Sequence, residues 1–191
     1  MTGAGANIGA AKHEIRRMIL AAREAMTPDD RVSAGAALAR HGLDRWVGRT
    51  RVAAYLDVGT EPPTRPLLDD LAATGCEIVV PVVSGEELDW VRYQPGGDVT
   101  TGALGVDEPT GERLGPTALR AAEVILVPAL AVDRHGNRLG RGRGYYDRAL
   151  ASVTTPVVAI TYDDELVESV PVEPHDRQVQ AVLRPAGYVP C

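Results

Sequence analysis

Residues 134–148 form a segment rich in glycine and arginine that follows the apolar run 124–128 and precedes a predicted helix. The segment contains four glycines and two adjacent tyrosines. Its five arginines against one aspartate give a local charge of +4, whereas the whole chain carries −6. Backbone N–H groups without bulky side chains can surround phosphate oxygens, and a following helix adds the positive end of its dipole. Arginines add paired hydrogen bonds to such oxygens. The segment therefore predicts a site for an anionic ligand, which the fold must place beside the apolar run.

The glycine spacing differs from that of the common nucleotide-binding loops. The segment lacks the GxxxxGK[ST] pattern of Walker loops, and Tyr145 stands where the third glycine of a GxGxxG motif would be. It also does not directly follow its strand, which disfavours a Rossmann dinucleotide site. Two further interpretations are a solvated surface turn and an RGG-like RNA-binding element, which would bind RNA with a steep salt dependence.

The length and composition indicate a single globular domain. The chain has 191 residues, of which 45% are hydrophobic and 24% charged, enough for one sizeable core. A net charge of −6 argues against a general nucleic-acid-binding protein. No apolar stretch reaches membrane-spanning length, and Cys76 and Cys191 belong to no CxxC pattern. We expect a cytoplasmic monomer that acts on a small molecule, without nucleic-acid or membrane partners.

Strands and helices are predicted to alternate along the chain. Apolar runs predict strands at 51–56, 76–83, 87–93, 124–127, 156–161 and 179–183. Periodic or capped segments predict helices at 8–26, 28–46, 114–122 and 145–153 and one ending at 73. This order predicts the α/β class, with a largely parallel central sheet flanked by helices in three α/β/α layers. Residues 1–7 are expected to be disordered.

The first predicted helix has a basic edge. Its apolar positions recur at spacings of three and four, and Lys12, Arg16 and Arg23 fall together along one side of the apolar face. One interpretation is a solvated basic flank. The other is that these long side chains lie over the margin of the core and reach a neighbouring anion.

Three acidic residues stand in predicted loops or at a helix start. Glu61 follows the strand at 51–56, where ligands bind in open α/β sheets, although a lone loop glutamate is also commonly just solvated. Asp147 either satisfies free amides at the start of its helix or helps to hold Mg²⁺ beside a phosphate. Asp176, in a proline-bounded loop, is a possible second carboxylate for that ion.

The run from Val127 to Asp147 resembles the signature of the 5-formyltetrahydrofolate cyclo-ligase family, also called 5,10-methenyltetrahydrofolate synthetases. The order of the remaining segments is similar to that family as well. A basic first helix contains Lys12 and Arg16, a strand and loop contain Leu56 and Glu61, and a late loop spans 171–176.

The resemblance implies an ATP- and Mg²⁺-dependent ring closure. In this reaction the formyl oxygen of 5-formyltetrahydrofolate attacks the γ-phosphate of ATP, and N10 then closes onto the formyl carbon as phosphate leaves. The products are 5,10-methenyltetrahydrofolate, ADP and phosphate. Such chemistry requires two substrates held in line and neutralised phosphate charge.

The resemblance also implies roles for particular residues. It assigns the nucleotide to Lys12, Arg16, Arg138, Leu139, Gly140, Arg141, Gly142, Arg143, Gly144, Tyr145 and Tyr146. It assigns the folate to Leu56, Glu61, Arg141, Arg143 and Tyr145, and the reacting groups to Arg141, Arg143 and Tyr145. It assigns Mg²⁺ to Asp147 and Asp176. Pro62-Pro63 departs from the usual family sequence, so an ATP-dependent enzyme with another acceptor is the alternative function.

Overall fold

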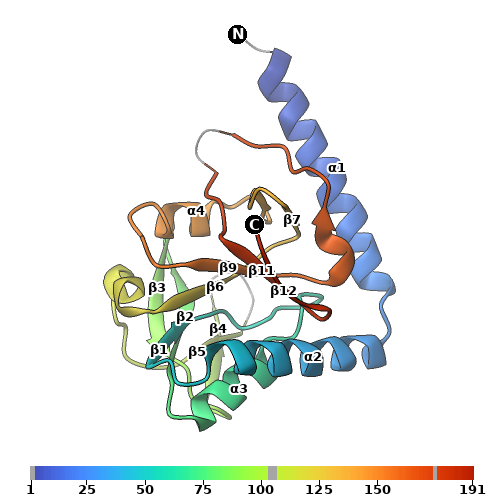
Figure 1. Ribbon diagram of the computed structural model, residues 1–191. Helices are drawn as coiled ribbons and strands as arrows, with labels where there is room; N and C mark the ends of the chain where they lie inside the picture. Colours follow the sequence, from blue (N-terminus) through green and yellow to red (C-terminus); the bar gives the residue numbers. More distant parts are fainter. Residues whose placement is uncertain (1–2, 103–106, 174–175) are drawn as a thin grey trace.

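A mixed sheet of seven strands forms the centre of the protein in the computed structural model, which describes residues 3–102, 107–173 and 176–191 (Figure 1). Its strands are β1 (Arg51–Ala53), β2 (Glu77–Ser84), β3 (Glu87–Arg92), β6 (Val124–Pro128), β9 (Val157–Ile160), β11 (Ala181–Arg184) and β12 (Gly187–Pro190). Their order is β12-β11-β9-β6-β1-β2-β3. The five central strands are parallel, and only the edge strands β12 and β3 pair antiparallel. This arrangement confirms the predicted class and the largely parallel sheet.

The most apolar run of the chain lies in the middle of this sheet. Ile125, Leu126 and Val127 of β6 are fully buried, because β1 and β9 flank the strand and both faces are covered. Strand β1 ends at Ala53, earlier than predicted. The amide of Ala54 still donates to Val79, after which the chain leaves the sheet. Strand β12 was not predicted.

The strand order reverses between β1 and β6. The chain passes from β1 outward to β2 and β3, and then returns to the other side of β1 to form β6 and β9. The segments that follow β1 and β6 therefore diverge at neighbouring positions on one edge of the sheet. Ligands of open α/β sheets bind at such a switch point.

Two helices cover one face of the sheet along its length (Figure 1). They are α2 (Pro28–Trp46) and α3 (Arg65–Ala73). The predicted start of α2 is confirmed: Thr27 accepts a hydrogen bond from the amide of Asp30, whose carboxylate in turn accepts one from the Thr27 amide. Leu38 of α2 and Leu67 and Leu71 of α3 are fully buried against the strands.

The opposite face is covered by short elements rather than by long helices. These are the 3₁₀ helix η1 (Pro116–Ala121) and α4 (Tyr145–Ala149). The predicted helix 114–122 is the tighter 3₁₀ helix η1, and the predicted helix 145–153 is the shorter α4. After α4 the chain continues to Val153 through hydrogen bonds spanning three residues, as in 3₁₀ turns, because β-branched residues and Pro156 disfavour further α-helix.

Helix α1 (Gly3–Ala25) projects past the body of the protein at the edge where the strands end (Figure 1). Residues 1–7 were expected to be disordered, yet the helix already includes residues 3–7, while 1–2 lie outside the described residues. Alanines at this end favour helix, and extending a formed helix needs no new nucleus. Ile15 and Ile19 pack on Ala131, Leu139 and Val170.

Two small sheets complete the described chain. One joins β10 (Leu166–Val167), β7 (Ala131–Asp133) and β8 (Arg138–Leu139), and the other pairs β4 (Val99–Thr101) with β5 (Asp107–Pro109). The glycine- and arginine-rich segment was expected to be all loop before its helix, but its start forms the β7–β8 hairpin. Asp133 closes the turn by accepting from the amides of His135 and Asn137. The 3₁₀ turn η2 (Asp163–Glu165) follows β9. No helix among the described residues is long and apolar enough to cross a membrane.

Candidate active site

The segments that follow β1 and β6 meet at the switch point of the sheet. The Nε of Arg141 donates to Oε1 of Glu61 over 3.0 Å, joining two residues that are 80 positions apart in the chain. Arg141 is half exposed, with 50% of its side chain accessible, whereas the Glu61 side chain is 9% exposed. The structure thus brings together the two loops that the resemblance assigned to the folate.

The loop 140–144 depends on glycine for its backbone path. Gly142 and Gly144 have φ angles of +94° and +70°, a conformation that side chains with a Cβ rarely adopt. The Nε of Arg16 donates to the carbonyl oxygen of Gly140 over 2.9 Å, and a Cβ on Gly142 would lie 3.4 Å from Nη2 of Arg16. Arg16 therefore supports the loop from the α1 side.

The arginines of the loop have different environments. Arg141 and Arg143 are exposed, as a ligand-binding role requires. Arg138 is buried and donates to Oδ1 of Asp147 over 2.8 Å, while its Nε has no partner among the described residues. Arg148 instead donates to the carbonyl oxygen of Glu86, which ties α4 to the turn between β2 and β3. Leu139 is buried in the cluster under α1.

The two adjacent tyrosines lie on different sides of this loop. The Tyr145 hydroxyl donates to the carbonyl oxygen of Gly85 over 3.3 Å, and the guanidinium of Arg148 lies over its ring. The guanidinium of Arg138 lies 5.8 Å from the centre of the Tyr146 ring. Burial, with the nearby charge of Glu61, raises the pKa of Tyr146 above its ordinary value. Tyr146 therefore stays neutral, and its ring lies beside the guanidinium of Arg138.

Glu61 is held as a nearly buried carboxylate. Its Oε2 accepts from the amide of Val58 over 3.1 Å, and its backbone oxygen accepts from the Tyr162 hydroxyl over 3.3 Å. Burial raises the pKa of Glu61 above its ordinary value, although the charge of Arg141 acts in the opposite direction. Leu56 is buried at the start of the same loop. The interpretation of Glu61 as a solvated loop residue is wrong.

The basic edge of α1 is not a solvated flank. Lys12 is buried, and its Nζ donates to Oε2 of Glu173 over 2.8 Å and to Oδ2 of Asp176 over 2.7 Å. Although burial alone would lower the pKa of Lys12, these two hydrogen bonds raise it. Arg23 is 2% exposed and pairs with Glu165. The edge therefore reaches carboxylates of the chain itself and the carbonyl of Gly140.

The two predicted metal ligands lie in segments that touch, Asp147 in α4 and Asp176 in the late loop. Oδ1 of Asp147 accepts from the amide of Arg177, the residue after Asp176, over 3.3 Å. Asp176 also accepts from Lys12 and from the amide of Glu173. Within residues 3–102, 107–173 and 176–191, no group of three or more His, Cys, Asp or Glu side chains is arranged to enclose a metal ion. Residues 174–175 of this loop lie outside the described residues.

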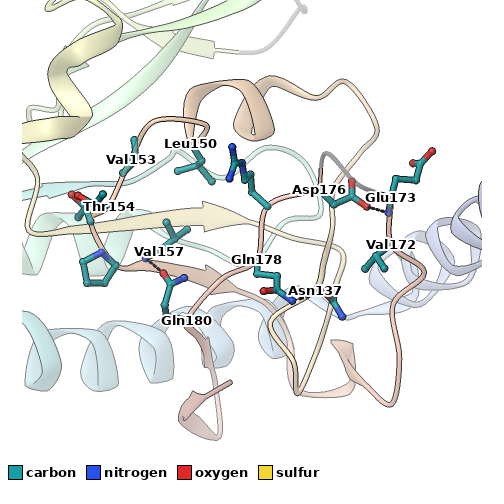
Figure 2. Close-up of a pocket in the computed structure, with 13 residues that line it drawn as sticks. Asn137, Leu150, Val153, Thr154, Val157, Val172, Glu173, Asp176, Gln178 and Gln180 are labelled. Carbon is teal, nitrogen blue, oxygen red and sulfur yellow. Dashed lines mark hydrogen bonds between the residues drawn. The ribbon is translucent and has the colours of Figure 1, made fainter.

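A cavity of about 730 Å³ adjoins Asp176. Figure 2 shows the side chains that line it. Leu150, Val153 and Val157 supply apolar side chains to its lining, and Asn137, Gln178 and Gln180 supply amides. The amide of Gln178 donates to Asn137 over 2.9 Å, and Gln180 accepts from the amide of Val157 over 2.7 Å. Val172, Glu173 and Asp176 line its other end.

Several residues of this region were not selected from the sequence. Tyr55, Tyr162 and Glu165 are all buried at the strand ends, and the hydroxyl of Tyr55 has no partner among the described residues. Burial raises the pKa of Tyr55 well above its ordinary value, and the charge of Glu61 adds to this effect. The only sequence signal is that Tyr55 lies near the carboxyl end of the predicted strand 51–56 and that Tyr162 directly follows the predicted strand 156–161. Nothing in the pattern distinguishes Glu165 from its acidic neighbours.

Comparison with known proteins agrees with this geometry. A sequence profile described as the 5-formyltetrahydrofolate cyclo-ligase family matches residues 8–185. A 5-formyltetrahydrofolate cyclo-ligase of Mycolicibacterium smegmatis is 44% identical over 72% of this chain and 74% of its own length. One from Escherichia coli is 32% identical over 88% of this chain and 97% of its own.

The solved structure of Aquifex aeolicus 5,10-methenyltetrahydrofolate synthetase is similar in fold, with a TM-score of 0.75 and 28% identity. The match covers 94% of this chain and 92% of that one. The resemblance first seen in residues 127–147 therefore extends over nearly the whole sequence and its fold, and the chain belongs to the 5-formyltetrahydrofolate cyclo-ligase family.

Proposed function

We propose that this protein converts 5-formyltetrahydrofolate into 5,10-methenyltetrahydrofolate while converting ATP into ADP and phosphate. The family and the named relatives support the ring closure, and the family implies the use of ATP. The observation that carries the assignment is the contact between Arg141 and Glu61 at the switch point. In this contact, a loop whose glycines and arginines suit phosphate binding lies next to a carboxylate that can accept hydrogen bonds from a pterin.

The described side chains fit a nucleotide triphosphate on one side of this contact. Arg141 and Arg143 are exposed and can reach phosphate oxygens, and the glycine backbone between them leaves room for a close approach. The Nε of buried Arg138, which has no partner in the part of the chain that the structure describes, is a further donor. Arg16 and Lys12 add positive charge from α1. We assign these residues, with the backbone of 139–144 and the two tyrosines, to binding the phosphates of ATP.

Glu61 and Leu56 fit the folate on the other side. A carboxylate that is 9% exposed offers strong acceptors in a site from which water is largely excluded, as the amino and ring N–H groups of a pterin require. We assign to Arg141, Arg143 and Tyr145 the role of holding the formyl group and the γ-phosphate in line.

We assign Mg²⁺ to Asp147 and Asp176. Mg²⁺ commonly binds one or two carboxylates together with substrate phosphates and keeps several waters, so a full protein cage is not needed. The hydrogen bond from the Arg177 amide to Asp147 supports a common site, because it joins α4 to the loop that contains Asp176. When bound, the ion would neutralise phosphate charge, and Arg138 and Lys12 hold the two carboxylates in position.

We place the adenosine in the cavity of Figure 2, which adjoins Asp176 and combines apolar walls with amide groups. Val172→Trp, at an exposed lining position, is expected to raise KM for ATP by roughly 10-fold and to leave KM for 5-formyltetrahydrofolate within about 2-fold. Val32→Trp, at an exposed position on α2, is the matched control. Equal effects of the two substitutions would contradict this placement.

The direct test is the absorbance of methenyltetrahydrofolate on mixing protein, 5-formyltetrahydrofolate, Mg²⁺ and ATP, with ATP omitted in a parallel sample. We expect a rise only when ATP is present. ATP binding without this rise would favour another acceptor. Monomeric state and cytoplasmic location stay predictions from the sequence; light scattering on the purified protein would test the first, and cell fractionation the second.

A further inference from the structure

The buried ion pair between Arg23 of α1 and Glu165 of η2 is not explained by phosphate chemistry. Nε and Nη2 of Arg23 donate to the two carboxylate oxygens of Glu165 over 2.6 and 2.8 Å. The two side chains are 2% and 6% exposed. Because the desolvation of two charges can exceed their attraction, a buried pair of this kind is weak evidence for a stabilising role alone.

Arg23, on one side of the pair, also holds the start of the segment that leads from β6 to residues 134–148. Nη2 of Arg23 also donates to the carbonyl oxygen of Ala129 over 2.7 Å. Ala129 is the first residue after β6, so this bond sets the direction in which the chain leaves the sheet toward residues 134–148. Arg23 therefore links α1 to the point where the chain leaves β6 toward residues 134–148.

The other side of the pair holds the Glu61 loop. Oε2 of Glu165 accepts from the amide of Tyr162 over 2.8 Å, and the Tyr162 hydroxyl donates to the backbone oxygen of Glu61 over 3.3 Å. The guanidinium of Arg23 lies 5.6 Å from the centre of the Tyr162 ring. A continuous chain of buried contacts thus runs from Ala129 to Glu61.

We propose that Arg23, Glu165 and Tyr162 are positioning residues for the folate site. They fix the Glu61 loop relative to Ala129, where the chain leaves β6 toward residues 134–148. Their effect on turnover rests on the proposed function, whereas their effect on the order of the Glu61 loop does not. None of the three is among the residues assigned to the reacting groups, Arg141, Arg143 and Tyr145. They act through the backbone that presents Glu61 and through the segment that leads to Arg141.

The double variant Arg23→Met/Glu165→Gln tests this by removing both charges, so that no unpaired charge stays buried, while the glutamine can still accept from Tyr162. We expect KM for 5-formyltetrahydrofolate to rise roughly 10-fold, because small displacements of a substrate-holding group are costly, and KM for ATP to change by less than about 2-fold. Tyr162→Phe removes only the hydroxyl and should show part of the same increase with little change in Tm. Arg23→Lys, which keeps a charge and one donor group, should lie between the wild type and the double variant.

Arg51→Met/Glu77→Gln is the matched control, because this partly exposed pair joins the starts of β1 and β2, at the opposite end of the strands. It should leave both KM values unchanged. If the Arg23/Glu165 variant lowered Tm without a selective rise in KM for the folate, the pair would be only structural and the proposal would be wrong.

Backbone hydrogen exchange gives a second measurement that needs no activity. In the double variant and in Tyr162→Phe, the amides of residues 57–61 and 64 should exchange faster, while those of α2 and α3 keep their protection. Wild-type protein without any methenyltetrahydrofolate signal would contradict the proposed function, and exchange would still decide the positioning role. Unchanged exchange in residues 57–61 and 64 would overturn that role even in an active enzyme.

Discussion

Glu61 combines a nearly buried carboxylate with a half-exposed arginine partner, and the balance between the two determines its protonation. Burial raises the pKa above the ordinary 4.5, and the opposing charge of Arg141 is the largest effect in the other direction. In the folded chain Glu61 therefore takes up its proton at a higher pH than in the unfolded chain. Between these two pKa values the folded state holds more protons, so the contribution of Glu61 to stability falls as pH rises.

The acid side of the pH profile should depend on Glu61. Because the ionised carboxylate is the proposed acceptor for the pterin, KM for 5-formyltetrahydrofolate should begin to rise on acidification at a pH above 4.5. Glu61→Gln should have a raised KM without this acid limb, whereas Glu112→Gln, at a well-exposed site, should keep the wild-type profile. Steady-state kinetics between pH 4.5 and 8 measure both, and an unchanged acid limb in Glu61→Gln would remove Glu61 from the site.

Arg141 should matter for turnover far more than for stability. Arg141 is half exposed, and removing its side chain opens the nearly buried Glu61 to water, so the ion pair contributes about 0–1 kcal/mol and Arg141→Ala should change Tm little. We expect kcat/KM to fall by roughly 100-fold, because a charge aimed at the phosphate is lost. Arg134→Ala, at an exposed arginine of the same segment, serves as control. Parallel losses of Tm and activity in Arg141→Ala would instead indicate a structural residue.

Helix α2 supports the Glu61 loop through a close contact. A Cβ on Gly35 would lie 2.9 Å from Cβ of Pro63, nearer than side-chain atoms normally approach. Pro63 therefore packs directly on a helix, at the distance that glycine allows. Helix α2, and not the loop sequence alone, therefore determines where the Glu61 loop lies.

Replacing a glycine inside a helix by alanine usually raises the free energy of unfolding, but Gly35→Ala should lower it. We expect a loss of about 1–3 kcal/mol in the free energy of unfolding, or a displaced loop with a raised KM for 5-formyltetrahydrofolate. Gly9→Ala on α1 is the matched control, because a Cβ there meets nothing within 4 Å, and it should stabilise the protein by about 0.5–1 kcal/mol. Denaturant unfolding and substrate titration measure both variants; a gain of stability in Gly35→Ala would show that Pro63 moves freely.

Across the whole molecule, α1 joins parts of the chain that the sheet leaves separate. Its basic edge contacts Ala129 and Gly140 after β6, Glu165 after β9, and the late loop through Glu173 and Asp176. The contacts with Ala129 and Glu165 lie beyond the carboxyl ends of the central strands β6 and β9. Ligands bound there should therefore stabilise the whole domain rather than one loop.

Nucleotide and metal should raise Tm together. At 100 times its Kd, a ligand that binds only the folded state adds about 2.7 kcal/mol of stability. We expect ATP with Mg²⁺ to raise Tm more than ATP alone, and Asp147→Asn to reduce this difference, because a carboxylate for the ion is lost. Asp70→Asn, on the exposed side of α3, is the control. Identical Mg²⁺ dependence in Asp147→Asn and the wild type would exclude Asp147 as a ligand.

The sequence by itself determined those features that arise from neighbouring residues. The central strand β6 follows from its apolar run, and the start of α2 follows from Thr27, Pro28 and Asp30, whose capping contacts span only a few positions. The segment 134–148 predicts an anion site because glycine backbone and clustered arginines act locally, and this site stays a prediction. Its long match to a family signature added the reaction, since such a run specifies many positions at once.

Only the tertiary structure decided which of these features meet and which are buried. Glu61 and Arg141 come together because the strand order places β6 beside β1, and that order depends on packing between distant segments. The same packing buried Lys12 and Arg23, which a helical pattern describes equally well as solvated, and it shaped the β7–β8 hairpin under α1. Local sequence sets the conformation of each segment, whereas the burial and partner of a charged side chain depend on residues far along the chain, and these are adjacent only after folding.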